Sequence, residues 1–542
     1  MREKRVVVVF FILVLLYSFL IVKLVMLSQP NSTINQAAQT HGSYIVKLSS
    51  TRGTIYDSSL NKLVNVKEQY VAAVAPVENT TAQFIALSPF VDNIQILTQK
   101  LSQRIPFSLN ISSPDISAES TDVLKTYVRY EDKAVSPALI GYLDSSGNGT
   151  AGIEKAFDTQ LKTYSKAVTA AFPVDATGRL LKGLSAEIRV EGLGDMGGVV
   201  LTLDKDIQQA AEQAANKFLK AGSVIVMDSK TGDILASVSS PTFSPNDLAA
   251  AMKGANSPMT NHVFSAYNLG SIFKIAVTAA ALESGISPDF QVTCTGSIDV
   301  SGQLFHCHLL SGHGKEDMSL GFENSCNPYY ITLGQKTGAD NILSMAKKLG
   351  FGQPSDFAPG LTSVAGSLPD TVTLKLPAAL ANFSMGQGEF LATPVQVARM
   401  VAAVANNGLL PAPRLVTGIV DNDLKFLKTY PGAVPDSVFS EKTADLIRQF
   451  MIKTVNEGTG KPAKPLYGGA GGKTSTAETG WVQNGKTINQ AWFAGFYPAE
   501  QPKYVIVAMC ENGIAGGADA GPVFKYIANA LAPRCGFPLV QQ

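Results

Sequence analysis

The sequence predicts an α+β fold in which one antiparallel sheet takes strands from two distant parts of the chain, with a lobe of helices beside it. First, β-rich runs occur both at residues 199–238 and near the C-terminus, at residues 473–510. Second, helical patterns fill the segment between them; third, a long apolar run opens the chain. We therefore expect four parts: a cytoplasmic tail (1–5), a transmembrane anchor (6–27), a mixed, dimerisation-like pedestal domain (28–195) and a C-terminal domain (196–542).

Size and charge narrow the class of protein. A chain of 542 residues is too long for one ordinary domain. The net charge is +1 and only 16% of the residues are charged, which argues against nucleic acid as a partner, because that would call for a clustered basic surface. Five cysteines are too few for a disulfide-stapled scaffold of this size.

The N-terminal apolar run is long enough to cross a membrane. Residues 6–27 contain only three polar side chains, and a bilayer core needs about 20 apolar residues. Arg2, Lys4 and Arg5 precede the run, so the positive-inside rule places the N-terminus in the cytoplasm and the rest of the chain outside. We expect an uncleaved, single-pass anchor in the cytoplasmic membrane. A cleaved signal peptide is the alternative, although no small-x-small cleavage site follows.

The pedestal region shows mixed patterns that end at a glycine-rich joint, residues 191–198. Its patterns predict strands at 51–57 and 70–75, a loop at 108–121, a helix at 152–161 and a turn at 175–178. The C-terminal domain should then contain a strand (199–203), a helix capped by Asp204 (to 219), a hairpin (223–228 and 234–238), three late strands (473–477, 491–496 and 504–510) and a closing helix (522–531).

A buried helix that begins near residue 271 carries the first candidate site. Ser271 falls in its first turn and Lys274 follows three residues later, so both side chains leave the same face. A serine hydroxyl becomes a good nucleophile when a neighbour takes its proton. A lysine in an apolar site can have a pKa low enough to do so. Ser-x-x-Lys alone is common in helices, so the sequence must supply companion motifs.

The first companion is Ser325-Cys326-Asn327-Pro328. Proline favours the first turn of a helix, so we expect Asn327 to cap the helix that follows. The Ser325 hydroxyl could relay a proton and the Asn327 amide could hold a substrate carbonyl; simple helix capping is the alternative.

The second companion is a strand that begins behind two glycines, Gly471 and Gly472. Glycines admit close approach, so a lysine and hydroxyls on such a strand edge suit recognition of a peptide carboxylate. These residues are Lys473, Thr474, Ser475 and Thr476.

Together, Ser-x-x-Lys, Ser-x-Asn and Lys-Thr-x in this order resemble the motif set of penicillin-binding proteins and class A β-lactamases. Nearly the whole chain resembles class B penicillin-binding proteins, the peptidoglycan D,D-transpeptidases of the division and sporulation type. Further matches are Arg52-Gly53-Thr54-Ile55-Tyr56-Asp57, Gly152-Ile153-Glu154, Gly386-Gln387-Gly388, Ala491-Trp492-Phe493-Ala494-Gly495 and Glu511-Asn512-Gly513. The resemblance implies a penicillin-binding, serine β-lactamase-like transpeptidase fold for residues 196–542.

The resemblance also implies roles and partners. Ser271 would attack the D-Ala-D-Ala bond, Lys274 would act as the base, and Ser325 would pass the proton to the leaving amine. The implied substrate-binding residues are Asn327, Lys473, Thr474, Ser475 and Thr476. The implied partners are peptidoglycan stem peptides, β-lactams, the cytoplasmic membrane and a lipid-II polymerase of the division or elongation machinery, with no cofactor.

The chain departs from the family pattern at three positions. Ser475 stands where glycine is usual, Leu269 where proline is usual, and Gln490 where a histidine is common. Alternate residues of a strand point the same way, so Lys473 and Ser475 should share a face. We expect the Ser475 hydroxyl near the substrate path, able to donate a hydrogen bond to Asn327 or Ser325.

Other functions require features that differ from these. A D,D-carboxypeptidase or β-lactamase must activate water, and the Glu-x-x-Leu-Asn element that supplies the class A base is absent from the sequence. A β-lactam sensor would be expected to carry further transmembrane helices and a signalling domain. A non-catalytic scaffold would tolerate loss of the motifs, yet all three are retained.

A group of metal-binding residue types lies at Cys294, His306, Cys307, His308 and His313. Zinc accepts such ligands, but the spacing matches no standard pattern, and on a strand His306 and His308 would face away from Cys307. We therefore expect no metal site. A Cys294–Cys307 disulfide is the alternative outside the membrane. A nucleophilic Cys326 would need a paired histidine that the sequence does not identify.

Overall fold

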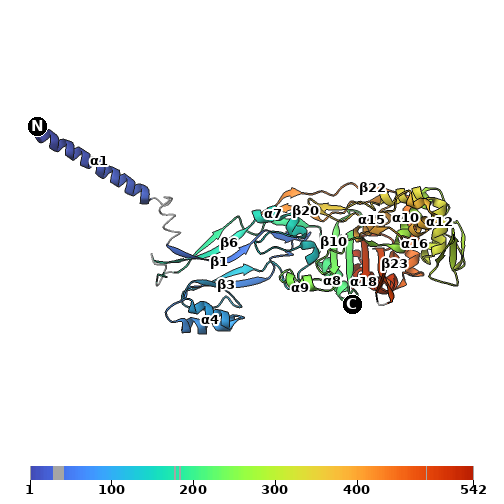
Figure 1. Cartoon of the computed structure of the whole chain (residues 1–542), viewed down its shortest axis with the longest axis horizontal. Coiled ribbons are helices and arrows are strands. Elements are labelled where there is room, and N and C mark those ends of the chain that lie inside the picture. Colours follow the sequence, from blue (N-terminus) through green and yellow to red (C-terminus); the bar gives the residue numbers. More distant parts are fainter. Residues whose placement is uncertain (1, 29–41, 176–178, 182–184, 484, 541–542) are drawn as a thin grey trace. The chain divides into compact units, whose positions relative to one another are not determined.

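The computed structural model describes residues 2–28, 42–175, 179–181, 185–483 and 485–540 (Figure 1). The chain divides into two compact units that interleave in sequence. The first comprises Met1–Arg52, Asn65–Arg129 and Tyr164–Asp195, and the second comprises Gly53–Val64, Tyr130–Thr163 and Met196–Gln542. Our prediction of one pedestal domain over 28–195 did not anticipate that two segments of this range belong to the second unit.

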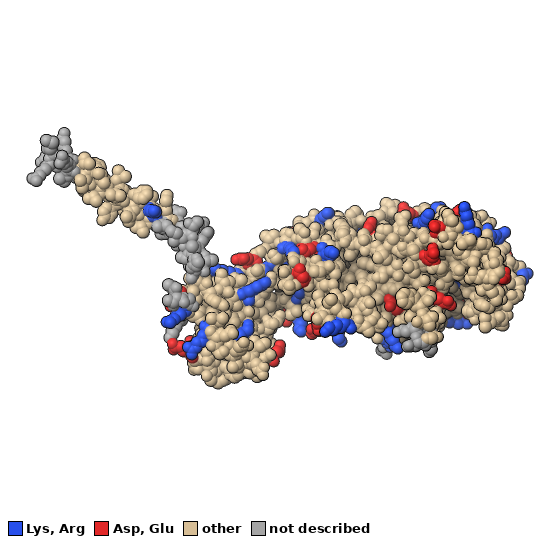
Figure 2. Space-filling view, in the orientation of Figure 1, with Lys and Arg blue, Asp and Glu red and all other residues tan. Residues whose placement is uncertain are grey.

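Helix α1 (Arg2–Ser28) contains the predicted membrane span. Its stretch Val7–Met26 has a mean hydropathy of 2.9. Lys23 is the only charged side chain in that stretch, and the part of this helix that Figure 2 colours is accordingly almost entirely tan. Within the described ranges, α1 alone is long and apolar enough to cross a membrane by length and composition.

Besides α1, the described residues of the first unit form two three-stranded sheets, two α-helices and one short 3-10 helix. Strand β3 lies between two small cores, because Val71 and Ala73 face one of them while Ala72 and Val74 face the other. Residues 108–111 form part of β4, so our loop prediction is wrong there; the predicted turn at 175–178 lies mostly outside the described residues. The elements are β1 (Ser43–Thr51), β6 (Lys166–Pro173) and β7 (Glu187–Glu191); β4 (Phe107–Ile111), β3 (Glu68–Val74) and β5 (Thr121–Tyr127); α3 (Thr80–Leu87), η1 (Ser88–Phe90) and α4 (Ile94–Ser102).

The second unit is built on a five-stranded antiparallel sheet with the order β10-β9-β25-β24-β23. As predicted, strands from distant parts of the sequence meet in it, since Val507 of β25 pairs with Ile225 of β9. Figure 1 shows the red C-terminal strands in the same sheet as the green β10. The strands are β9 (Gly222–Asp228), β10 (Ile234–Ser240), β23 (Gly471–Gln483), β24 (Lys486–Tyr497) and β25 (Tyr504–Glu511).

Helices cover both faces of this sheet. Helices α8 (Lys205–Phe218) and α18 (Gly521–Leu531) pack on one face, where Val224, Val226 and Phe493 point. Helices α15 (Pro394–Ala405) and α16 (Glu441–Asn456) pack on the other, where Ile225 and Trp492 point. Because they are buried on both faces, the central strands β9 and β25 are nearly continuously apolar.

The helical lobe packs on α10 (Lys274–Glu283), which is buried on all sides. The other lobe helices are α11 (Met318–Glu323), α12 (Asn327–Thr337), α13 (Ala339–Lys348) and α14 (Pro377–Ser384). A mixed sheet joins the segment 53–64 to the second unit, because β2 pairs in parallel with β8. It comprises β2 (Thr54–Tyr56), β8 (Gly198–Leu201), β20 (Val416–Val420) and β21 (Phe426–Thr429).

Short elements complete the second unit. The predicted helix at 152–161 is two helices that meet at Phe157. The short helices of the second unit are α5 (Pro137–Ile140), α6 (Gly152–Ala156), α7 (Asp158–Thr163), α9 (Leu248–Lys253), α17 (Gly516–Asp519), η2 (Gly270–Phe273), η3 (Thr373–Lys375), η4 (Lys461–Ala463) and η5 (Ala532–Cys535). Its short strand pairs are β11 (Tyr267–Asn268) with β18 (Leu391–Ala392), β12 (Val292–Cys294) with β15 (Gly314–Glu316), β13 (Ser297–Val300) with β14 (Gln303–His306), β16 (Asp356–Ala358) with β17 (Leu361–Thr362), and β19 (Leu409–Leu410) with β22 (Asp436–Ser437).

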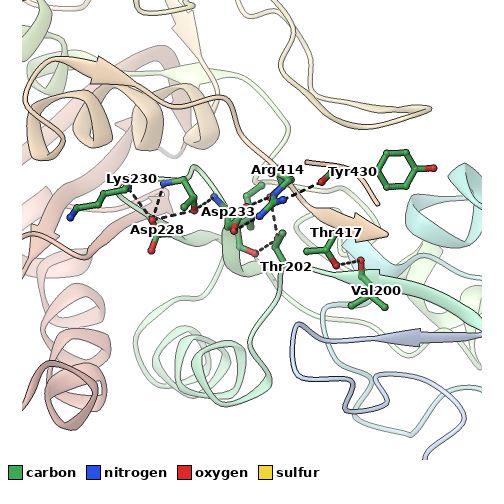
Figure 3. Close-up of polar contacts among 10 residues, drawn as sticks. Val200, Thr202, Asp228, Lys230, Asp233, Arg414, Thr417 and Tyr430 are labelled. Atoms are coloured by element: carbon green, nitrogen blue, oxygen red, sulfur yellow. Dashed lines mark hydrogen bonds and ion pairs between the residues drawn. The ribbon is translucent and has the colours of Figure 1, made fainter. Parts of the chain in front are cut away.

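An ion pair connects the five-stranded sheet of the second unit to its four-stranded mixed sheet (Figure 3). Arg414, just before β20, donates to both carboxylate oxygens of Asp233 beside β10, at 2.5 and 2.7 Å. Its third contact is the Tyr430 carbonyl oxygen, at 3.1 Å. The Thr202 hydroxyl, after β8, lies 2.7 Å from the Ile234 carbonyl oxygen and 3.1 Å from that of Arg414. A bidentate, partly buried ion pair of this kind contributes more to the stability of the fold than an exposed ion pair does.

We expect Arg414→Met to lower the free energy of unfolding by about 1–3 kcal/mol, because hydrogen bonds to charged groups are lost and Asp233 keeps an uncompensated charge. The control is Lys425→Met, which removes the exposed Lys425–Asp423 pair (3.7 Å) and should change stability by less than about 0.5 kcal/mol. Urea unfolding of both variants measures the difference; equal effects would show that the Arg414 pair contributes no more than a surface pair.

Candidate active site

The candidate nucleophile lies where a tight turn enters the central helix. Ser271 belongs to η2, which runs directly into α10 at Lys274, as the sequence predicts. Gly270 has φ +60°, and a Cβ there would lie 2.5 Å from the Ser475 Oγ. Its N–H donates to the Gly386 carbonyl oxygen at 2.8 Å. Glycine is therefore required at 270 both for its backbone conformation and for close packing.

The Lys274 ammonium is fully buried and makes three hydrogen bonds. Its Nζ donates to the Ser325 carbonyl oxygen at 2.7 Å, to the Ser325 Oγ at 3.3 Å and to the Asn327 Oδ1 at 2.9 Å. A lysine ammonium has three donors, so these acceptors satisfy it completely. The contacts join the first motif to the second.

Burial lowers the pKa of Lys274 to about 8, against the opposing effect of Cys326, Cys307 and Glu316. The cause is that a low-dielectric surrounding disfavours the charged form. A substantial fraction of Lys274 is therefore neutral near pH 8 and can accept a proton.

The second motif lies between α11 and α12. Ser325 has φ +54°, a left-handed conformation uncommon for serine, and this directs its carbonyl oxygen and hydroxyl to Lys274. Our prediction that Asn327 caps the helix is wrong: Cys326 is the cap, and Asn327 is the first helical residue. The Asn327 side chain instead accepts from Lys274 and donates from Nδ2 to the His306 carbonyl oxygen at 3.1 Å.

The third motif occupies β23, beside η2. Lys473 is fully buried, and its Nζ lies 3.3 Å from the Thr474 carbonyl oxygen and 5.7 Å from the centre of the Phe322 ring. Burial, assisted by the charge of Lys274, lowers the pKa of Lys473 well below its ordinary value.

Ser475 shares a face with Lys473, as strand alternation predicts, but it does not reach the second motif. Its hydroxyl donates to the Leu269 carbonyl oxygen at 2.7 Å and is buried under Gly270. Our expectation of a hydrogen bond to Asn327 or Ser325 is wrong, because η2 passes directly over this face of β23.

The opposite face of β23 carries two threonines. The Thr474 hydroxyl donates to the Thr459 Oγ at 2.9 Å, and the Thr476 hydroxyl accepts from the Gly516 N–H at 3.3 Å. Both threonines therefore lie against the segments that precede and follow the three C-terminal strands.

A cavity of about 770 Å³ opens between η2, α12 and β23. Of the predicted site residues, Ser271, Asn327 and Thr476 line it; Lys274, Ser325, Lys473, Thr474 and Ser475 are buried around it. Further lining residues that sequence reasoning did not assign to the site include Asn268, His306, Gln387, Glu478 and Asn489. Gln387 belongs to the Gly386-Gln387-Gly388 match. Gly386 accepts a hydrogen bond from the Gly270 N–H, and this contact places the match beside the turn that carries Ser271.

Part of the cysteine and histidine group converges behind the second motif. Cys294, Cys307 and His313 lie together with Cys326, a residue that its position in the sequence did not connect with the other three. All five cysteines are free thiols, so the Cys294–Cys307 disulfide that the sequence left open as an alternative is not formed.

Comparison with known proteins agrees with this geometry. Residues 222–529 match the family model described as the penicillin-binding protein transpeptidase domain. Among relatives, the peptidoglycan D,D-transpeptidase PbpA of Mycobacterium tuberculosis is 33% identical over 362 residues, covering 62% of this chain and 72% of the relative. The stage V sporulation protein D of Bacillus subtilis is 30% identical over 419 residues, covering 73% of this chain and 62% of that protein.

Solved structures show the same fold. Penicillin-binding protein 3 of M. tuberculosis complexed with aztreonam has a TM-score of 0.65 and 26% identity, over 92% of this chain and 98% of that one. A ceftriaxone acyl-enzyme complex of penicillin-binding protein A of M. tuberculosis has a TM-score of 0.65 and 25% identity, over 89% and 98% of the two chains. The family model covers more than half of the sequence, and the three motifs surround one cavity within it. This chain therefore belongs to the penicillin-binding protein transpeptidase family.

Proposed function

We propose that the protein is a membrane-anchored serine D,D-transpeptidase that crosslinks peptidoglycan stem peptides through an acyl-enzyme, and that β-lactams acylate the same serine. The observation that carries the proposal is the buried Lys274, which begins the helix behind Ser271 and donates to Ser325 and Asn327. Relatives named as peptidoglycan D,D-transpeptidases and a neighbour captured as a ceftriaxone acyl-enzyme support it.

In acylation, Ser271 Oγ attacks the carbonyl carbon of the penultimate D-alanine while its proton passes to neutral Lys274. The peptide C–N bond then breaks. The departing D-alanine amine takes a proton through the Ser325 hydroxyl, which lies 3.3 Å from the Lys274 Nζ. We assign the oxyanion hole to the backbone N–H groups of Ser271 and Thr476, since both residues line the cavity.

In the second half, an amine of a neighbouring stem peptide attacks the acyl carbon, and a new amide C–N bond forms as the ester bond to the Ser271 Oγ breaks. The proton that the amine loses passes to neutral Lys274 and from there to the released Ser271 Oγ. We assign Asn327 to the peptide amide and Thr476 to the terminal carboxylate, because both line the cavity. We also assign Lys473 and Thr474, which lie on opposite faces of β23, to the carboxylate end of the site. Ser475 acts on the site by bonding the Leu269 carbonyl under the turn that carries Ser271.

The proposal places the N-terminus in the cytoplasm and the catalytic unit outside, because Arg2, Lys4 and Arg5 precede the span. It includes a lipid-II polymerase as a membrane partner, which would supply the uncrosslinked strands.

We expect Ser271→Ala to lose covalent labelling by fluorescent penicillin. The variant lacks the hydroxyl that we propose as the nucleophile, which lies in the turn directly before Lys274 and the central helix. Peptide mapping of the labelled wild type should locate the adduct at Ser271. A label on Ser325 or Cys326 would contradict the assignment.

We expect Lys274→Met, which keeps the volume but removes the base, to slow acylation by about 10²–10⁴-fold, the usual contribution of general base catalysis. Initial, non-covalent penicillin binding should change much less. Stopped-flow acylation kinetics separate the two steps, with Lys347→Met on the exposed side of α13 as the control. An acylation rate within a few-fold of wild type would remove Lys274 from its role.

We expect Ser475→Ala to slow acylation roughly tenfold, because losing about 1–2 kcal/mol of hydrogen bonding leaves the Leu269 carbonyl unsatisfied and the Ser271 turn less fixed. Ser229→Ala is the matched control, since its buried hydroxyl donates to the Pro502 carbonyl oxygen at 2.8 Å away from the cavity. Both variants should lose similar stability. Acylation that is equally fast in both would show that the Ser475 bond does not position Ser271.

A further inference from the structure

Four side chains with metal-binding atoms meet behind the second motif. The sulfur atoms of Cys294, Cys307 and Cys326 and a ring nitrogen of His313 all lie within 4.8 Å of one another. The three cysteines are 2%, 2% and 0% exposed, and the His313 side chain is 7% exposed. Pairing of β12 with β15 brings Cys294 opposite Gly314, next to His313. The group is therefore a built, enclosed feature of the fold.

The distances suit a tetrahedral ion. Bond lengths of about 2.3 Å to sulfur and about 2.0–2.1 Å to nitrogen at tetrahedral angles place neighbouring ligand atoms about 3.6–3.8 Å apart. The Cys307 Sγ and His313 Nδ1 are 3.5 Å apart. His308 Nδ1 lies 3.9 Å from the same sulfur but outside the mutually close group.

We propose that Cys294, Cys307, Cys326 and His313 bind one zinc ion as a closed Cys3His site. Three sulfur ligands and an imidazole favour zinc over magnesium or calcium, which prefer oxygen. Four protein ligands in a buried setting leave no position for substrate, so the site is structural. It replaces our expectation of no metal.

A neighbouring carboxylate supports the assignment. Glu316 is 1% exposed, and its Oε2 has no hydrogen-bond partner among the described residues. That oxygen lies 4.0 Å from the His313 Nδ1. Glu316 therefore places a carboxylate beside the histidine nitrogen that faces the Cys307 sulfur, where its negative charge would add to the attraction for a cation. Its Oε1 accepts from the Asn324 Nδ2 at 2.9 Å, which joins this carboxylate to the residue before Ser325.

The site would fix the position of the second motif. Cys326 lies between Ser325 and Asn327 and occupies the N-cap of α12 without a side-chain capping bond. The ion would bind this residue to β12 and to the segment between β14 and β15. Disulfides could not replace it fully, since pairing any two of the three thiols leaves the third unpaired.

Zinc content of the full chain tests the proposal. The protein is purified in detergent without chelator, and metal is measured by inductively coupled plasma mass spectrometry. We expect about one zinc ion per chain, lost in Cys294→Ser and His313→Asn. Cys510→Ser removes a buried thiol elsewhere and His308→Asn removes the adjacent imidazole; both should retain the ion. Wild type without zinc, or zinc that persists in the first two variants, would overturn the site.

A second measurement uses the wild type, so it does not depend on whether variants fold. Chelator treatment should release the zinc and make three further thiols reactive to a maleimide, with peptide mapping at residues 294, 307 and 326. Adding Co²⁺ to the chelated protein should give thiolate-to-cobalt charge-transfer and tetrahedral d–d absorption bands. A disulfide between any two of these cysteines in the native protein, or no change in thiol reactivity on chelation, would contradict the proposal.

Discussion

The site depends on the burial of one ammonium group. An unpaired charge in the interior costs several kcal/mol, so Lys274 at the start of the central helix requires three oxygen acceptors. They come from a different segment, whose backbone turns left-handed at Ser325 to present them. The motif Ser325–Asn327 is thus held against η2 and α10 by the lysine that we propose as the base for Ser271. The same burial lowers the pKa of Lys274. Burial of this ammonium therefore both fixes the position of the Ser325–Asn327 motif and makes the lysine able to accept a proton.

Backbone contact fixes the other side of the site. Gly270 lies against Ser475 and Ala477 of β23 on one side and bonds the Gly386 carbonyl oxygen on the other. The Ser475 hydroxyl and the Trp492 Nε1 bond the carbonyl oxygens of Leu269 and Asn268, which directly precede this glycine. These contacts with the sheet fix the position of the turn that carries Ser271. A proposed nucleophile needs such a fixed position, because a small displacement from the substrate slows the reaction.

Local patterns in the sequence were sufficient for much of this arrangement. The spacing of Ser271 and Lys274, the late strands and the apolar N-terminal helix depend on neighbouring residues, and the structure contains all of them. Long-range contacts decided the rest. The direction of Ser475 depends on where η2 crosses β23, and the Cys3His group depends on hairpin pairing that brings Cys294 to His313. The interleaved units follow from parallel pairing of β2 with β8, which no local pattern indicates.

Strand β25 lies in the middle of the main sheet, between a hairpin made early in the chain and another made late. The order of synthesis therefore separates β9 from its partner until almost the whole protein has emerged. Until then the Val- and Ile-rich edge of β9 has no partner, and unpaired apolar edges promote aggregation. Closing the sheet also brings together segments far apart in sequence, a topology associated with slow folding. The edge of β9 that β25 covers in the folded sheet can therefore be paired within the chain only after the C-terminal strands have been made.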